Sequence, residues 1–317
     1  MPVPMGATRA ALNHALMVLP LAVLAASCAH TGESLKPLRL PATALAATGA
    51  TGPAYLVRTP AGASVTLADA ADELAAADVV FLGEQHDNAV GHAVQLALTE
   101  ALANLRGEII LSMEMFERDS QPTLDLYLAG ALTEEEFKAA TRLWPNYDDH
   151  YRGAVEMCRE RGFSVLAANV YRPIASRVAR EGLHASLGDP WAAQSVHAPT
   201  DSEYFRRFRG VMGGHDGEVD DAVMNRVFAA QCVKDDTMAE SISAALDATP
   251  DGDSRPQVIH WNGRFHSDFG LGTVERLKLR NPSLNIAVVS MVERMPTLAE
   301  PLTEEELNQG HFIIIAR

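Results

Sequence analysis

Five apolar runs, each short enough to be a buried strand, alternate along this chain with segments of helical periodicity. The runs cover residues 78–83, 108–116, 163–170, 257–263 and 284–292, and helices are expected over about 90–105, up to about 161, from Pro173 onward and near 273–279. Strands and helices that alternate in this way are typical of a parallel sheet with helices on both faces. The sequence therefore predicts an α/β fold with a mainly parallel sheet flanked by helices.

One stretch breaks the alternation. Residues 182–217 mix Gly, Pro, His and Asp around the run EYFRRFRG, and a long helical pattern follows to about residue 245. We expect a helical subdomain inserted around residues 183–250 and lying over the sheet. Cys158 and Cys232 fall in predicted helices, and we interpret them as buried free cysteines.

The N-terminal segment differs from the rest of the chain. Residues 1–27 contain no acidic residue, and the apolar run over 15–26 has the length of a signal-peptide core. The following LAASC resembles a bacterial lipoprotein cleavage site with Cys28 as the acylated residue, although the usual leucine is displaced by one position, to Leu24. An ordinary cleaved signal is the alternative. We expect a signal peptide over 1–27, a lipid-anchored tether over 28–53 and a folded domain over 54–317, exported to the cell envelope and held at the membrane by lipid.

The charge of the chain limits its partners. The formal net charge is −15 at pH 7, the isoelectric point is near 5.1, and no run of Lys or Arg offers a local exception. Nucleic acid and anionic lipid head groups are repelled by such a chain. We therefore predict no binding of nucleic acid.

Polar residues and flanking glycines gather where four of the predicted strands end. The carboxyl ends of parallel strands meet at one edge of a sheet, which is where ligands bind in such folds. The sequence thus predicts one site from four strands. Its rim residues are Glu84, His86, Glu114 and His266, and its supporting residues are Gly83, Asp87, Asn88, His92, Asn169, Arg172, Gly263 and Arg264.

Glu114 interrupts an apolar strand. A carboxylate there must be paired, bound to metal or shifted toward neutrality, because burial of an unpaired charge is costly. A structural salt bridge to Arg118 or Arg172 is the alternative to a functional role.

His86 and His266 each stand three residues after a glycine at a strand end. Either could be a structural histidine of the core, whereas the pair together with Glu84 and Glu114 indicates a site. Such a set suits zinc or another divalent metal, or acid–base chemistry without metal. In the helix that follows the first strand, Asp87 or Asn88 is expected as the cap, and His92 either extends the site or faces solvent.

Five motifs in one order, from about residue 79 to 292, resemble the ChaN-like haem-binding lipoproteins of the Tiki and erythromycin-esterase-like superfamily. They are LGEQHDNAVGH, LSMEMFERDSQPTLDLYLAG, LWPNYDDHYRGAVEMCRERGFSVLAANVYRP, QCVKDDTMAESI (the family's QxxxDxxMA) and NGRFHSDFGLGTVERL. The resemblance implies an α/β domain with a helical subdomain that binds haem, with two haems face to face across a homodimer, in haem or iron uptake. In the wider superfamily, metalloproteases carry two GxxH motifs and a strand glutamate, which match Gly83 to His86, Gly263 to His266, and Glu114.

The resemblance leaves the haem ligand open. Haem iron accepts Tyr or His, and propionates pair with Arg or Lys. Tyr204, with its aromatic and arginine neighbours, is one candidate, although that run also fits an amphipathic helix that packs Phe205 and Phe208 on the core. Tyr171 and His215 are the others. The sequence has no CxxCH, so the haem is expected to be held without covalent bonds.

Three functions follow from these patterns. The first, which we favour, is a haem-binding envelope lipoprotein, and the sequence leaves open whether it is also an enzyme. The second is a metal-dependent hydrolase of peptides or esters in which Glu84, His86, Glu114 and His266 hold a zinc ion. The third is a scaffold whose polar groups only satisfy one another.

Overall fold

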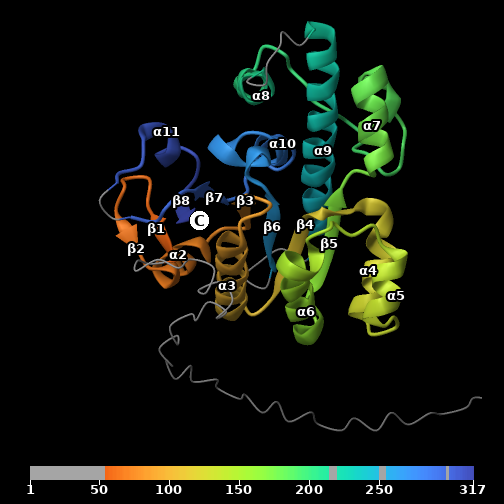
Figure 1. The fold of residues 1–317 in the computed structure, drawn as a ribbon. Coiled ribbons are helices and arrows are strands. Elements are labelled where there is room, and N and C mark those ends of the chain that lie inside the picture. Colours follow the sequence, from red (N-terminus) through yellow and green to blue (C-terminus); the bar gives the residue numbers. More distant parts are fainter. Residues whose placement is uncertain (1–53, 214–219, 250–254, 298–299) are drawn as a thin grey trace, which may run out of the picture. The chain divides into compact units, whose positions relative to one another are not determined.

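The computed structural model describes residues 54–213, 220–249, 255–297 and 300–317, all of which belong to the unit Pro37–Arg317. They form an eight-stranded sheet in the order β2-β1-β8-β7-β3-β6-β4-β5, with helices on both faces (Figure 1). The strands are β1 Tyr55–Arg58, β2 Ser64–Val65, β3 Val79–Glu84, β4 Ile109–Glu117, β5 Ser164–Asn169, β6 Gln257–Gly263, β7 Ile286–Glu293 and β8 Phe312–Ala316. The helices are α2 Leu67–Leu74, α3 Ala89–Arg106, α4 Gln121–Leu128, α5 Glu134–Ala140, α6 Arg152–Arg161, α7 Arg172–Glu181, α8 Glu203–Gly213, α9 Asp221–Asp247, α10 Thr273–Arg280 and α11 Glu304–Leu307, with short turns η1 Arg118–Ser120, η2 Tyr147–Tyr151, η3 Leu183–Ser186, η4 Arg264–His266 and η5 Asp268–Gly270.

The predicted α/β fold is confirmed. Strands β3 to β8 pair in parallel, and only β1 runs antiparallel to its neighbours β2 and β8. Alternate residues of each strand face opposite layers, as the pleat requires. In β3, Val80 and Leu82 pack toward α2 and α3, whereas Val79 and Phe81 pack toward α9 and α10.

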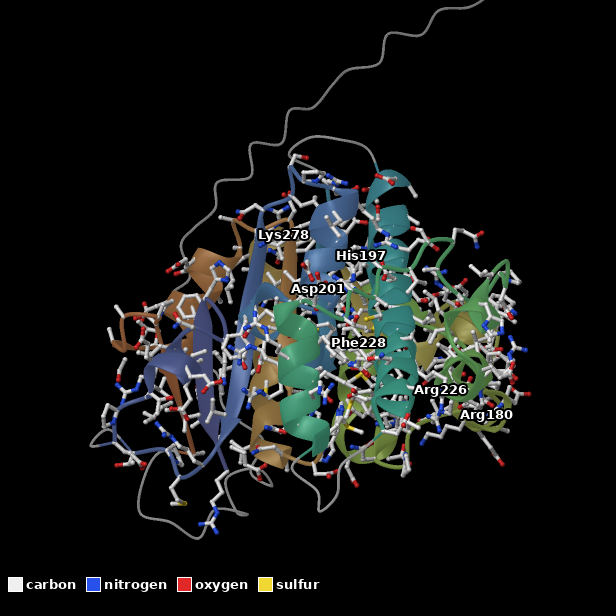
Figure 2. All side chains as sticks on the ribbon, turned by 90° about the horizontal axis from the view of Figure 1, so that it is seen from above. Arg180, His197, Asp201, Arg226, Phe228 and Lys278 are labelled. Atoms are coloured by element: carbon white, nitrogen blue, oxygen red, sulfur yellow. The ribbon has the colours of Figure 1, made fainter. Side chains whose placement is uncertain are left out.

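The expected insertion is helical, and it is continuous with the main core. The second half of α9 lies on the sheet through Ile242 and Leu246. Its first half carries Phe228, labelled in Figure 2, against which the rings of Phe205 and Phe208 from α8 pack. The amphipathic interpretation of EYFRRFRG therefore holds, because both phenylalanines are buried while Arg206 is exposed.

Local sequence signals act largely as expected. Asn88, and not Asp87, caps α3, since its side chain accepts a hydrogen bond from the N–H of Gly91. Gly162 follows α6 in the left-handed conformation that glycine favours. Cys158 and Cys232 are buried and free, as predicted.

Several sequence predictions concern residues that the structure does not describe. They are the signal peptide over 1–27, the acylated Cys28, the tether over 28–53 and the haem-ligand candidate His215. Of the helices in the described part of the chain, none is long and apolar enough to cross a membrane.

The side chain of Gln121 forms hydrogen bonds with the open edge of β5, the last strand of the sheet. The Gln121 amide donates to the carbonyl of Val165 and accepts from the N–H of Ala167, so it occupies the place of a neighbouring strand.

Gln121→Ala should lower the free energy of unfolding by roughly 1–3 kcal/mol, because two backbone groups lose a partner. Urea unfolding monitored by circular dichroism measures this. Gln194→Ala, at an exposed position, is the matched control and should change stability little. Equal stability of the two variants would show that water replaces the Gln121 contacts without cost.

Candidate functional site

A cavity of about 720 Å³ opens at the carboxyl ends of β3, β4, β5 and β6. Helices α7, α8 and α9 form its walls above the sheet. Its lining includes the predicted residues Glu84, His86, Glu114, Asn169, Arg172, Gly263, Arg264 and His266. The four strand ends therefore do meet in one place.

His86 is oriented by Glu84. Nδ1 of the imidazole lies 2.9 Å from Oε1 of Glu84, a buried carboxylate that also accepts hydrogen bonds from Tyr151 and Gln95. A carboxylate only accepts, so Nδ1 carries a proton and Nε2 is the ring atom available to a ligand. The side chain of His86 is 43% exposed. Burial lowers the pKa of His86, but the hydrogen bond with Glu84 and the charge of Glu114 outweigh it and raise the pKa above 6.5.

His266 lies between two buried carboxylates. Nδ1 is 2.7 Å from Oδ1 of Asp235 on α9, and Nε2 is 3.3 Å from Oε1 of Glu114. Both partners accept, so both ring nitrogens carry protons. Burial opposes this charge, but the attraction of Glu114 and Asp235 outweighs it and raises the pKa of His266 to about 10. Asp235 also accepts hydrogen bonds of 2.8 Å from Tyr204 and Thr273.

Glu114 is an ionised carboxylate. Burial alone would raise its pKa, but the charge of His266 and the hydrogen bond with it hold the pKa well below the ordinary range. The structural partners considered from the sequence do not pair with it. Arg118 pairs with Glu240, and Arg172 pairs with Glu117. The partner of Glu114 is instead the second histidine of the site.

Gly263 lies between the Glu84–His86 pair and the Glu114–His266 pair. Its N–H donates to Oε2 of Glu114 at 2.7 Å. A Cβ on Gly263 would stand 2.7 Å from Nε2 of His86 and 3.5 Å from Oε2 of Glu114. Any side chain there would displace the His86 ring, so the glycine lets His86 and Glu114 approach the same point of the cavity.

The supporting residues hold this arrangement in place. His92 is buried, with Nε2 donating to the carbonyl of His86, so it neither faces solvent nor lines the cavity. Asn169 donates to the carbonyl of Glu114. Arg264 is paired with Asp268.

Gly83 and Asp87 stand apart from the cavity. A Cβ on Gly83 would stand 2.8 Å from Oγ of Ser267, so this glycine permits close packing below the site. Asp87 is exposed and does not line the cavity.

Neither tyrosine predicted as a haem ligand lines this cavity. Tyr204 is 1% exposed, its hydroxyl donates to Asp235, and burial raises its pKa well above 10. Tyr171 precedes α7 and stacks with Arg142, 4.8 Å from the guanidinium carbon to the ring centre.

Sequence reasoning missed several residues of the site. Asp235 and Gln231 are the acidic and amide residues of the QxxxDxxMA motif, so the motif held a signal that was not used. Lys234 lies between them and also lines the cavity. Tyr151, which holds Glu84, stands in the W-P…Y segment.

The geometry does not fit the predicted zinc site. Within the described ranges, no group of three or more His, Cys, Asp or Glu side chains is placed to hold a metal ion. Zinc binds the neutral form of imidazole, whereas both nitrogens of His266 face carboxylates. The four predicted ligands form two hydrogen-bonded pairs instead, Glu84 with His86 and Glu114 with His266.

Fold and site together define an α/β protein with a cavity at the carboxyl edge of a mainly parallel sheet. The sequence model of the family described as "Haem-binding uptake, Tiki superfamily, ChaN" matches residues 70–277, more than half of the 317 residues, and the chain belongs to this family. No curated protein matches the sequence.

The solved structures that are similar to this chain include a ChaN protein and an erythromycin esterase. "Cofacial heme binding to ChaN of Campylobacter jejuni" is 17% identical, covers 83% of this chain and 97% of its own, and has a TM-score of 0.64, which supports the fold. A mutant of the erythromycin esterase EreC in its open conformation is 14% identical, covers 78% of this chain and 81% of its own, and has a TM-score of 0.44, too low to support an argument.

Histidine ring protonation should differ sharply between two buried positions. His266 should remain an imidazolium at pH 8, because its pKa is raised to about 10. His260, buried beside Ser112, should be neutral at pH 5, because burial lowers its pKa to about 3. Long-range ¹H–¹⁵N NMR of the rings, assigned with His266→Gln and His260→Gln, measures both.

The same shift sets a direction for stability. The pKa of His266 is about 10 in the folded protein and 6.5 for an ordinary histidine of the unfolded chain. Protonated His266 therefore stabilises the fold fully below pH 6.5, and this contribution is lost as pH rises through about 10. The stability advantage of wild type over His266→Gln should therefore shrink toward pH 10. A neutral His266 ring at pH 8 would contradict the two-carboxylate arrangement.

Proposed function

We propose that this protein binds haem reversibly in the cavity at the sheet edge, as an envelope lipoprotein that handles haem or iron. Membership of the haem-binding ChaN family supports haem as the ligand. The observation that carries the proposal is the combination of one half-exposed, carboxylate-oriented imidazole with a largely apolar cavity of about 720 Å³. Sites for small molecules and cofactors typically enclose roughly 300–1,000 Å³.

The residues of the cavity fit the requirements of haem. A macrocycle needs apolar and aromatic walls, and its propionates need cations. Apolar lining comes from Trp144, Val170, Ala175, Ala179, Phe208, Met212, Val227, Ala230 and Phe265, and cations from Arg172, Lys234 and Arg264.

His86 is the best-placed iron ligand among the described residues. Its Nε2 reaches the open space beside Gly263, and its Nδ1–H is held by Glu84, which is how carboxylates orient histidine ligands. Tyr204 would have to give up its bond with Asp235 and lose a proton that burial helps it retain. When bound, the haem supplies the iron chemistry, and the chain supplies the oriented imidazole and a sheltered cavity.

Export, the lipid anchor and a homodimer belong to the same proposal. The lipoprotein-like N-terminal sequence supports export and anchoring at Cys28. A protein held on the membrane by lipid and carrying a reversible haem site suits haem or iron uptake. Mass spectrometry of the protein from a membrane fraction tests the acylation of Cys28.

Titration of the mature protein with haemin should give a saturable shift of the Soret band. His86→Ala should weaken binding by about tenfold or more and change the spectrum, because the imidazole ligand is lost. Glu84→Gln should change the spectrum less, since it perturbs only the orientation of the ring. His184→Ala, away from the cavity, is the control. A non-saturating response of the wild type would refute haem binding, and an unchanged His86→Ala spectrum would refute His86 as the ligand.

A hydrolase of peptides or esters is the second candidate. The Glu84–His86 pair favours it, because a half-exposed imidazole held by a buried carboxylate is the arrangement of a general base. Such an enzyme should turn over peptide or ester substrates, and His86→Ala should reduce the rate by about 100-fold or more. Metal analysis of protein purified without chelators accompanies the assay. The absence of both bound metal and His86-dependent turnover would remove this candidate.

A further inference from the structure

Helices α7 and α9 each present one face to the cavity. The lining residues of both helices follow the same spacing of three, one and three positions, which places four residues on one side of a helix. They are Arg172, Ala175, Ser176 and Ala179 on α7, and Val227, Ala230, Gln231 and Lys234 on α9.

On both helix faces, the side chains far from the sheet are mostly apolar, and the side chain nearest the sheet is charged. Arg172 is the first residue of α7, directly after β5, so it lies at the sheet end of its helix. Helix α9 approaches the sheet as it proceeds, because Ser241 donates to the carbonyl of Ala168 in β5. Lys234 therefore lies about 10 Å nearer the sheet along α9 than Val227 does. A ligand that fills the cavity meets charge at the sheet end and apolar side chains farther out.

The charges at this end are almost all compensated within the protein. Glu84 accepts hydrogen bonds from His86, Tyr151 and Gln95.

The other charged groups on the rim are also paired. Glu114 has His266, while Glu117 pairs with Arg172 and with Arg142 outside the lining. Arg264 pairs with Asp268.

Lys234 is different from these groups. Among the described residues, no acidic side chain lies within 4 Å of its ammonium group, and no hydrogen bond is formed by it. Its charge still attracts the Glu114 carboxylate, which lies beyond that distance and already has His266 as its partner. Lys234 is also partly buried, so an anion that pairs with it would be screened less than at an open surface.

We propose that Lys234 recognises a carboxylate of the bound ligand, so that the cavity selects an amphipathic molecule that carries a carboxylate on an apolar body. This inference rests on the proposed haem function, in which a propionate supplies the carboxylate. Lys234 then sets ligand specificity, while His86 sets iron coordination.

Porphyrin esters separate these two roles. Haemin and iron-free protoporphyrin IX, each as the free acid and as the dimethyl ester, are titrated in one detergent-containing buffer by absorbance and fluorescence. Wild type should bind each free acid about tenfold more tightly than its ester, the effect expected of one charge-assisted hydrogen bond. Lys234→Gln should lose most of this preference through weaker binding of the acids.

Two further variants test whether the preference for the free acids is due to Lys234. Lys278→Gln removes the same charge from an exposed position on α10, labelled in Figure 2, and should bind like the wild type. His86→Ala should weaken the binding of haemin much more than that of protoporphyrin IX, and the acid preference of protoporphyrin IX should persist.

The outcomes separate the two proposals. Equal binding of acid and ester by wild type, or an unchanged preference in Lys234→Gln, would overturn the role of Lys234 while leaving haem binding intact. Lysine-dependent binding of protoporphyrin IX acid without a Soret shift of haemin would support Lys234 and refute iron coordination. No saturable binding of any of the four ligands by wild type would overturn both proposals.

Discussion

The site depends on a buried imidazolium held between two carboxylates. His266 bonds Asp235 on α9 and Glu114 on β4, so one side chain ties the wall helix to the floor strand. Removing either partner of a buried ion pair leaves an uncompensated charge, which is far more costly than losing an exposed pair. Tyr204 and Thr273 donate to the remaining lone pairs of Asp235, which is fully buried, whereas Glu114 and His266 also line the cavity. This interaction helps to hold α9, which also packs on the sheet through Ile242 and Leu246, as one wall of the cavity.

The two histidines of the site consequently have different roles, although their sequence contexts look alike. Both stand three residues after a glycine at a strand end. His266 is almost fully buried and uses both ring nitrogens inside the protein, whereas His86 is 43% exposed and uses only one. Gly263 keeps the space beside His86 open while its own N–H serves Glu114. Only His86 is therefore free to meet a ligand.

The sequence predicted the sheet and the polar residues at its edge because both leave simple local patterns. The strand ends at Glu84 and Gly263 are marked by a change from apolar to polar residues, and parallel pairing brings them together. Asp235 was missed because an acidic residue within a long helix has the same local pattern as an exposed one. Its burial comes from tertiary packing of α9 beside His266 and α10, and the QxxxDxxMA motif was the signal in the sequence that could have marked it. The hydrogen bond from the Tyr204 hydroxyl to Asp235 was not expected from the sequence, because it also depends on tertiary packing.

The compensation of charge at the cavity floor bears on what can bind there. A floor with an uncompensated carboxylate would attract a metal ion or another cation. Here Glu84 and Glu114 both accept hydrogen bonds from donors of the protein itself, and the positive charge of His266 lies beside Glu114. Among the charged groups that line the cavity in the described residues, Lys234 has no ion-pair partner within 4 Å, although its charge attracts Glu114 from farther away, and the ring atom left open is Nε2 of His86. A cavity with these two open groups and apolar walls suits a neutral or anionic amphipathic ligand with an electrophilic centre, and this supports the proposal that the ligand is haem.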